Sequence, residues 1–167
     1  CDSPLTGDTR NPWDPTRTPG GSSGGAAVAA ISGMATLNIG SDGGGSIRMP
    51  SAFCGTFGLK ATHAFVPLYP PGGSGLLSHV GPITRTVRDC AHLMATIAVP
   101  DARGIYPTQH DARSWLGSIE DGVAGLRIAY SPAYGSAVVD PQIAAAVERT
   151  VALLADLGAQ VELADPG

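Results

Sequence analysis

Two serines, each embedded in a cluster of glycines, are the residues of this sequence best placed for chemistry. Ser22 lies in Gly-Gly-Ser-Ser-Gly-Gly at 20–25, and Ser46 ends the run Asp-Gly-Gly-Gly-Ser at 42–46, so the two hydroxyls are 24 positions apart. Glycine lets a backbone approach a ligand closely. Consecutive N–H groups beside a hydroxyl can stabilise the oxyanion that forms when the hydroxyl attacks a carbonyl carbon. One such cluster is typical of a turn, whereas the pair indicates acyl-transfer chemistry.

Residues of both clusters can be given roles in the hydrolysis of an amide or ester. Ser46 is the candidate nucleophile, because it lies where a loop leads into a helix whose N-terminal end favours negative charge. The N–H groups of Gly43, Gly44 and Gly45, with that of Ser46 itself, form the candidate oxyanion hole. Ser22 can bridge Ser46 to a base. We therefore expect Ser46 and Ser22 to be catalytic.

Three further side chains flank the clusters and are candidates for supporting roles. Asp42 and Arg48 can pair and so hold the glycine loop, or they can form an ordinary ion pair without such a role. Ser23 can donate a hydrogen bond near the site, or it can cap a helix that begins at Gly24. The sequence leaves both questions open.

Other chemistries fit these residues less well. Gly-Gly-Ser-Ser-Gly at 20–24 matches the Gly-x-Ser-x-Gly nucleophile elbow, but that elbow follows a buried strand, which the prolines within 12–19 argue against. A phosphate-binding loop needs Gly-Lys-Ser or Gly-Lys-Thr, and neither follows a cluster. His79, oriented by Asp42, could be the base of a Ser–His–Asp triad, although a packed or hydrogen-bonded loop residue is the simpler interpretation.

The elements predicted around the clusters form an α/β fold with a mixed β-sheet covered by helices. A short helix over 24–33, a strand over 35–39 and a helix from 46 to about 55 position the two serines. The loop at 63–82 is expected to line a substrate pocket, with the apolar candidates Phe65, Tyr69, Leu76 and Leu77. Elsewhere the pattern predicts irregular segments at 1–21 and 100–125, helices at 87–98 and 141–158, and strands at 126–130 and 160–163.

Four motifs resemble the amidase signature family: Gly-Gly-Ser-Ser-Gly-Gly, Gly-Ser-Asp-Gly-Gly-Gly-Ser-Ile-Arg, Ser-Ala-Phe-Cys-Gly and Gly-Leu-Lys. Enzymes of this family hydrolyse carboxamides with a Ser–Ser–Lys triad. The resemblance implies that Ser46 is the nucleophile, that Ser22 is the bridging serine, and that the Gly21–Ser22 peptide bond is cis. It is strongest over 10–62 and only general beyond residue 100.

The resemblance also implies a catalytic lysine well before the first cluster, where this chain has none. Lys60 is the only lysine and matches Gly-Leu-Lys, which is not the catalytic position. We therefore expect residues 1–167 to be the central part of a single amidase signature domain. The N-terminal part, with the lysine, and the C-terminal part are expected outside the chain. Without that lysine, the isolated chain should be inactive.

Within the family, the glutamine-hydrolysing subunits of tRNA-dependent amidotransferases usually carry Asp-Thr-Gly-Gly-Ser where this chain has Asp-Gly-Gly-Gly-Ser at 42–46. The loop after Lys60 also lacks their Tyr-Gly and Ser-Arg pattern. These departures favour a stand-alone amidase acting on linear amides. The alternatives that remain are a non-catalytic fragment of the fold and a glutaminase subunit.

Composition narrows the choice of partners. The formal net charge of −4 and the absence of basic clusters argue against nucleic acid. Cys1, Cys54 and Cys90 are odd in number and lack metal-ligand spacing, which predicts neither disulfides nor a zinc site and favours the cytoplasm. No apolar run is long enough for a membrane span. We expect no cofactor, a small amide substrate and contacts with the rest of the polypeptide, and leave a homo-oligomer open.

Overall fold

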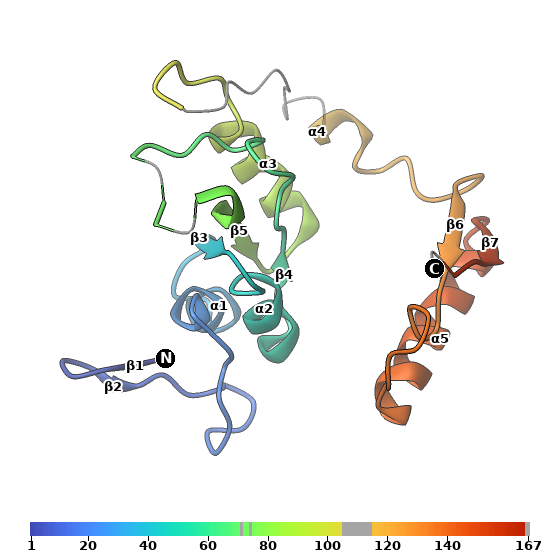
Figure 1. Ribbon diagram of the computed structural model, residues 1–167, viewed down its shortest axis with the longest axis horizontal. Helices are drawn as coiled ribbons and strands as arrows, with labels where there is room; N and C mark the ends of the chain where they lie inside the picture. The colour runs from blue at the N-terminus through green and yellow to red at the C-terminus, as the bar shows by residue number, and fades with distance from the viewer. Residues whose placement is uncertain (71, 74, 105–114, 166–167) are drawn as a thin grey trace. The chain divides into compact units, whose positions relative to one another are not determined.

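The computed structural model describes residues 1–70, 72–73, 75–104 and 115–165. The chain divides into two compact units, Cys1–Ile119 and Glu120–Gly167, shown in Figure 1. The first unit contains both serine clusters. In the described residues, no helix is long and apolar enough to cross a membrane.

The first unit is built on a three-stranded antiparallel sheet. Its strands are β3 (Leu37–Asp42), β5 (His79–Thr84) and β4 (Phe57–Gly58), in the order β3-β5-β4. The predicted strand at 35–39 is therefore present in part: it begins at Leu37 and extends to Asp42, which lies opposite His79 in the register. The second serine loop begins directly at the end of this strand.

The central strand β5 corrects the prediction of an irregular segment over 63–82. Residues 79–82 are part of this strand, although they contain Gly81 and Pro82. The Pro82 carbonyl accepts a hydrogen bond from the N–H of Leu59 at 3.1 Å. A side chain at residue 81 would collide with the Leu59 carbonyl oxygen, so the close approach of that segment requires glycine. The two residues that suggested a loop thus serve the packing of a strand.

Helices α1 (Gly24–Ile31) and α2 (Arg48–Cys54) cover one face of this sheet. Figure 1 shows them together on the side of the sheet opposite α3. The core between them and the sheet consists of small and branched side chains, namely Ala27, Ala30, Ile47, Cys54 and Ile83. The predicted helices are confirmed, although α1 ends at Ile31 and α2 begins two residues later than expected. Helix α2 ends at Cys54, and the φ of 73° at Gly55, its C-cap, is left-handed.

Helix α3 (Val87–Ile97) covers the other face of the sheet. It confirms the predicted helix over 87–98. Thr86 caps it by accepting a hydrogen bond from the Asp89 N–H at 3.0 Å. A second core cluster lies beneath it, made of Ala61, Cys90, Met94 and Ala98. Phe65 stacks on Trp115 of the short helix α4 (Trp115–Ser118), with ring centroids 5.4 Å apart. Residues 105–114 of the predicted irregular segment at 100–125 lie outside the described residues.

The N-terminal segment was predicted to be irregular but contains a small hairpin. Strands β1 (Asp2–Ser3) and β2 (Gly7–Asp8) pair antiparallel. The remaining residues bind the end of α2: the Asn11 amide donates to the Phe53 carbonyl at 2.9 Å, and the Trp13 indole donates to the Cys54 carbonyl at 2.8 Å. These bonds satisfy carbonyls that a helix end leaves without partners.

The second unit is a strand–helix–strand unit, and its elements confirm the prediction. Strands β6 (Arg127–Tyr130) and β7 (Gln160–Leu163) pair parallel and are connected through α5 (Pro141–Asp156). Asp140 caps α5 by accepting the Gln142 N–H at 2.8 Å. The chain turns at Gly158, whose φ of 95° favours glycine. Antiparallel and parallel pairs both occur, so the chain has the predicted mixed α/β character.

Candidate active site

The two serine loops are joined by a backbone hydrogen bond. The N–H of Ser23 donates to the carbonyl of Ser46 at 3.3 Å. The Ser23 hydroxyl donates to the Ser41 carbonyl at 3.3 Å and accepts the Ser41 N–H at 3.1 Å. Ser23 occupies the N-cap position of α1 but makes no side-chain cap. Its role is therefore to bind the loop of Ser22 to the strand that leads into the loop of Ser46.

The expected cis peptide bond is present between Gly21 and Ser22. The Ser22 residue is exposed, and Ser46 is half-buried. Gly20, with φ of 78°, packs on α2 so closely that a side-chain carbon there would lie 3.0 Å from the Cα of Pro50. The glycine before the cis bond therefore allows this loop to lie against the helix that follows Ser46.

Asp42 organises the loop of Ser46 from inside. Its side chain is fully buried and accepts the N–H groups of Gly45 at 2.6 Å and Ile47 at 3.2 Å. The Arg48 guanidinium binds both carboxylate oxygens, at 2.9 and 3.0 Å. The hydrogen bonds from Arg48, together with those from the backbone N–H groups, hold the pKa of Asp42 well below its usual range. The hydrogen bonds to Asp42 in turn raise the pKa of Arg48. The predicted pair is confirmed, and its contacts favour the supporting role.

The backbone N–H groups of the glycine run differ in their hydrogen-bond partners. The Gly45 N–H is occupied by Asp42, and Gly45 has a φ of 118°. For the N–H groups of Gly43, Gly44 and Ser46, the described part of the chain provides no hydrogen-bond acceptor. Gly43 and Gly44 are also exposed. The prediction that Gly45 donates to an oxyanion is therefore not supported, because Asp42 accepts its N–H, whereas the N–H groups of Gly43, Gly44 and Ser46 remain candidates for that role.

The Ser–His–Asp interpretation of His79 is wrong. His79 Nδ1 lies 2.8 Å from the Leu77 carbonyl oxygen and 3.1 Å from the Asp42 carbonyl oxygen. A carbonyl only accepts, so Nδ1 carries the proton and binds backbone. The carboxylate of Asp42 points to Arg48 and the glycine loop and does not orient the imidazole. His79 is hydrogen-bonded, as the simpler interpretation held, but it begins strand β5 and does not lie in a loop.

Lys60 and Cys54 make contacts of the fold outside the two serine loops. Lys60 donates its ammonium group to the Ala61 carbonyl at 2.8 Å. Cys54 lies in the core below the loop of Ser46, where burial raises the pKa of its thiol, and all three cysteines are free. Among the described residues, no three of His, Cys, Asp and Glu gather closely enough to hold a metal ion.

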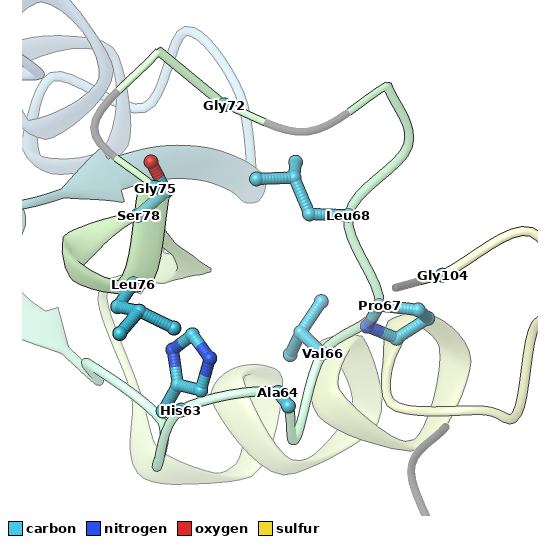
Figure 2. A pocket seen from close by; sticks show the side chains of 10 residues that line it. All are labelled: His63, Ala64, Val66, Pro67, Leu68, Gly72, Gly75, Leu76, Ser78 and Gly104. Atoms are coloured by element: carbon cyan, nitrogen blue, oxygen red, sulfur yellow. The ribbon is translucent and has the colours of Figure 1, made fainter. Parts of the chain in front are cut away.

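Two neighbouring cavities adjoin the loop at 63–78. The first has a volume of about 170 Å³ and is lined, as Figure 2 shows, by His63, Ala64, Val66, Pro67, Leu68, Gly72, Gly75, Leu76, Ser78 and Gly104. The second, of about 250 Å³, is lined by Ser41, Asp42, Gly43, Leu68, Gly72, Gly73, Ser78, His79 and Val80. The second cavity thus reaches the start of the glycine run.

Of the four apolar residues predicted to line a pocket, Leu76 does so. Phe65 instead packs in the core on Trp115, Tyr69 lies beside the Arg103 guanidinium, and Leu77 is exposed without lining either cavity. Sequence reasoning did not name four other lining residues of the loop at 63–78, Ala64, Val66, Pro67 and Leu68. The succession of apolar residues before Pro70 is the signal that could have identified them.

Known proteins resemble this chain in sequence and fold. The Amidase family profile matches residues 1–167. A glutamyl-tRNA(Gln) amidotransferase subunit of Heliobacterium modesticaldum is 41% identical over 154 residues, and the corresponding subunit of Moorella thermoacetica is 42% identical over 155. Each alignment covers 92% of this chain and 32% of the relative.

Solved structures show the same fold. A bacterial aryl acylamidase of the amidase signature family superimposes with a TM-score of 0.87 at 35% identity, over 96% of this chain and 33% of that one. The corresponding glutamyl-tRNA(Gln) amidotransferase subunit of Thermotoga maritima gives 0.81 at 38% identity, over 95% and 35%. The chain thus spans about a third of the length of these relatives. It belongs to the amidase signature family.

Proposed function

We propose that the polypeptide containing residues 1–167 hydrolyses a carboxamide C–N bond, with Ser46 as the nucleophile. Ser22 passes the proton of Ser46 to a lysine supplied by a part of the polypeptide outside these residues. A small amide is the substrate, and the reaction needs no cofactor. The backbone bond from Ser23 to Ser46 is the observation that carries this proposal, because it places the two serine loops side by side.

The proposed reaction has two halves. The Ser46 oxygen attacks the amide carbon while its proton moves through Ser22 to the neutral lysine. The N–H groups of Gly43, Gly44 and Ser46 stabilise the oxyanion. When the C–N bond breaks, the lysine returns the proton through Ser22 to the leaving amine, and an ester remains on Ser46. Water then attacks that ester, loses a proton along the same relay and releases the acid.

Amide hydrolysis by the complete polypeptide tests this proposal. Ser46→Ala should abolish turnover, and Ser22→Ala should lower kcat by about 100- to 10,000-fold, the usual contribution of acid–base catalysis. Ser32→Ala is the matched control, because Ser32 is an exposed serine at the end of α1. Turnover that survives Ser46→Ala would refute the proposed nucleophile.

A glutaminase subunit of an amidotransferase is the second candidate, supported by the curated relatives at 41–42% identity. Against it stand the departures at 42–46 and after Lys60. Glutamine and a simple amide, each assayed with the purified polypeptide alone, separate the two candidates. Turnover of the simple amide indicates a stand-alone amidase. Glutamine turnover that appears only when partner subunits are added indicates the amidotransferase, and an intact but unreactive complete polypeptide indicates a non-catalytic member of the fold.

A further inference from the structure

We propose that the 170 Å³ cavity holds an apolar group of about the size of a benzene ring from the amide substrate. We call this cavity the apolar chamber; its apolar side chains are Ala64, Val66, Pro67, Leu68 and Leu76. The inference rests on the proposed function and specifies the substrate class. Neither Ser22 nor Ser46 lines this cavity, and all of its lining residues except Gly104 lie between β4 and β5.

The lining of the apolar chamber matches an uncharged, apolar group. Besides the five apolar side chains and three glycines, it contains His63 and Ser78, and no Asp, Glu, Lys or Arg occurs among its described lining residues. A charged group there would lose hydration without meeting an oppositely charged Asp, Glu, Lys or Arg side chain in the described lining, which is costly. A cavity of about 150 Å³ with apolar walls is known to accept benzene, and the volume here is about 170 Å³.

The apolar chamber adjoins the cavity that reaches the glycine run. Leu68, Gly72 and Ser78 line both cavities. Gly72 lies between the other two, because a side-chain carbon there would be 2.9 Å from the Ser78 Cβ and 3.1 Å from the Leu68 side chain. Figure 2 shows Leu68 across the apolar chamber from Ser78. A bulkier residue at position 72 would occupy the space between the two cavities.

The second cavity does not offer a free charge, although Asp42 lines it. The Asp42 carboxylate is occupied by Arg48 and backbone N–H groups. Gly43, in the same lining, carries one of the N–H groups left without an acceptor in the described chain. An amide whose carbonyl oxygen lies at the glycine run can therefore extend its apolar half across Gly72 into the apolar chamber.

Leu76 and Leu77 form a matched pair for testing this inference. Both belong to the short 3-10 helix η1 (Gly75–Leu77), and both are 63% exposed. Leu76 lines the apolar chamber and Leu77 does not. A charged side chain at either position is similarly exposed to solvent and should affect folding similarly. A difference in substrate preference between the two variants therefore reports on the apolar chamber.

The experiment compares three substrates of the complete polypeptide. Benzamide places the phenyl ring in the acyl half, acetanilide places it in the amine half, and acetamide carries none. At least one phenyl substrate should exceed acetamide in kcat/KM by roughly tenfold or more, as expected for burial of a ring. Leu76→Asp should lower that ratio at least about tenfold, mainly through KM. Leu76→Met and Leu77→Asp should preserve it.

The outcomes separate this inference from the proposed function. A higher kcat/KM for benzamide than for acetamide assigns the apolar chamber to the acyl half of the substrate. A higher kcat/KM for acetanilide than for acetamide assigns it to the amine half. If acetamide is hydrolysed as well as both phenyl substrates, or if Leu76→Asp and Leu77→Asp change the kcat/KM ratio equally, the inference about the apolar chamber is refuted and the proposed function stands. Absence of all amide turnover, with no fluorophosphonate label on Ser46 in a folded protein, overturns the proposed function and this inference with it.

Discussion

Asp42 shows how one buried side chain can set the geometry of the loop that carries Ser46. Its carboxylate binds two N–H groups of the turn and the Arg48 guanidinium, so the backbone after β3 must fold around it. Arg48 itself is half-exposed, whereas the Asp42 side chain is fully buried. Removing the carboxylate charge therefore leaves several donors without their partner, while the other member of the pair can return to water.

Asp42→Asn should destabilise the protein by about 1–3 kcal/mol, the scale observed when buried hydrogen-bonding groups lose their partner. Denaturant unfolding of the complete polypeptide measures this loss. Asp8→Asn is the control, because the Asp8–Arg10 pair is exposed and exposed pairs contribute little. Equal stability of the Asp42→Asn variant and the wild type would show that the buried carboxylate does not hold the loop.

The same carboxylate should make stability depend on acid pH. The folded state lowers the pKa of Asp42 through hydrogen bonds from Arg48 and the backbone. The stabilisation is therefore fully present above the ordinary carboxyl pKa of about 4 and is lost as the pH falls below it. The unfolding free energy of the wild type should decrease more steeply below pH 4 than that of Asp42→Asn. Parallel pH profiles would contradict this prediction.

At the scale of elements, Gly40 allows β3 to pack closely against its neighbours, because it has no side chain. A side-chain carbon there would lie 2.9 Å from Ile83 Cδ1, 3.0 Å from Ile47 Cγ1 and 3.0 Å from the Ser23 Cβ. These neighbours belong to the sheet, the loop of Ser46 and the loop of Ser22. The spacing of the serine loops therefore depends on how closely the strand and helix pack.

Gly40→Ala should destabilise the protein by about 1–3 kcal/mol, as overpacking does, and should also lower amide turnover. Gly25→Ala is the control within α1, because a side chain at residue 25 has no neighbour within 4 Å. That variant should be neutral or more stable by up to about 1 kcal/mol, since alanine favours the helix. Thermal unfolding of both variants tests the contrast, and a fully stable Gly40→Ala protein would refute it.

The cap of α3 allows a second prediction at this scale. Thr86→Ala removes the oxygen that accepts the Asp89 N–H and should cost about 1 kcal/mol of stability. Thr86→Ser keeps the oxygen and should retain most of the stability. Chemical denaturation measures both, and an equal loss in the two variants would mean that the methyl group, rather than the cap, matters.

The elements that could be predicted carry their signals locally. Thr86, Asp140, Pro141 and Gly158 mark helix ends by their own chemistry, and α3, α5, β6 and β7 appear where those signals place them. Strand β5 could not be predicted in full, because its Gly81–Pro82 step is favoured by packing against Leu59, which lies 22 positions before Gly81 in the sequence. Tertiary contacts there override local preference.

The site shows the same division. The ion pair of Asp42 with Arg48 follows from their short spacing and could be predicted. The two roles of Ser23 could not be separated, because its partner Ser41 lies on a strand that only the fold brings near. The occupied N–H of Gly45 was likewise hidden, since the direction of each donor in a glycine run depends on backbone angles that glycine leaves open.

At the scale of the whole molecule, the proposed reaction requires a base from outside residues 1–167. The one lysine of this sequence is bound to the Ala61 carbonyl in the segment after β4. The relatives that the chain matches are about three times as long. We therefore expect the isolated chain to show no measurable amide turnover and the complete polypeptide to be active. Normal activity of the isolated chain would refute the lysine relay.

Fluorophosphonate labelling of the complete polypeptide, with the modified peptide mapped by mass spectrometry, tests the central claim most directly. The claim is that Ser46 is an activated nucleophile whose proton leaves through Ser22. It predicts a label on Ser46 that Ser46→Ala abolishes, Ser22→Ala slows and Ser32→Ala leaves unchanged. A label on another residue, or a folded protein that takes no label at all, would contradict it.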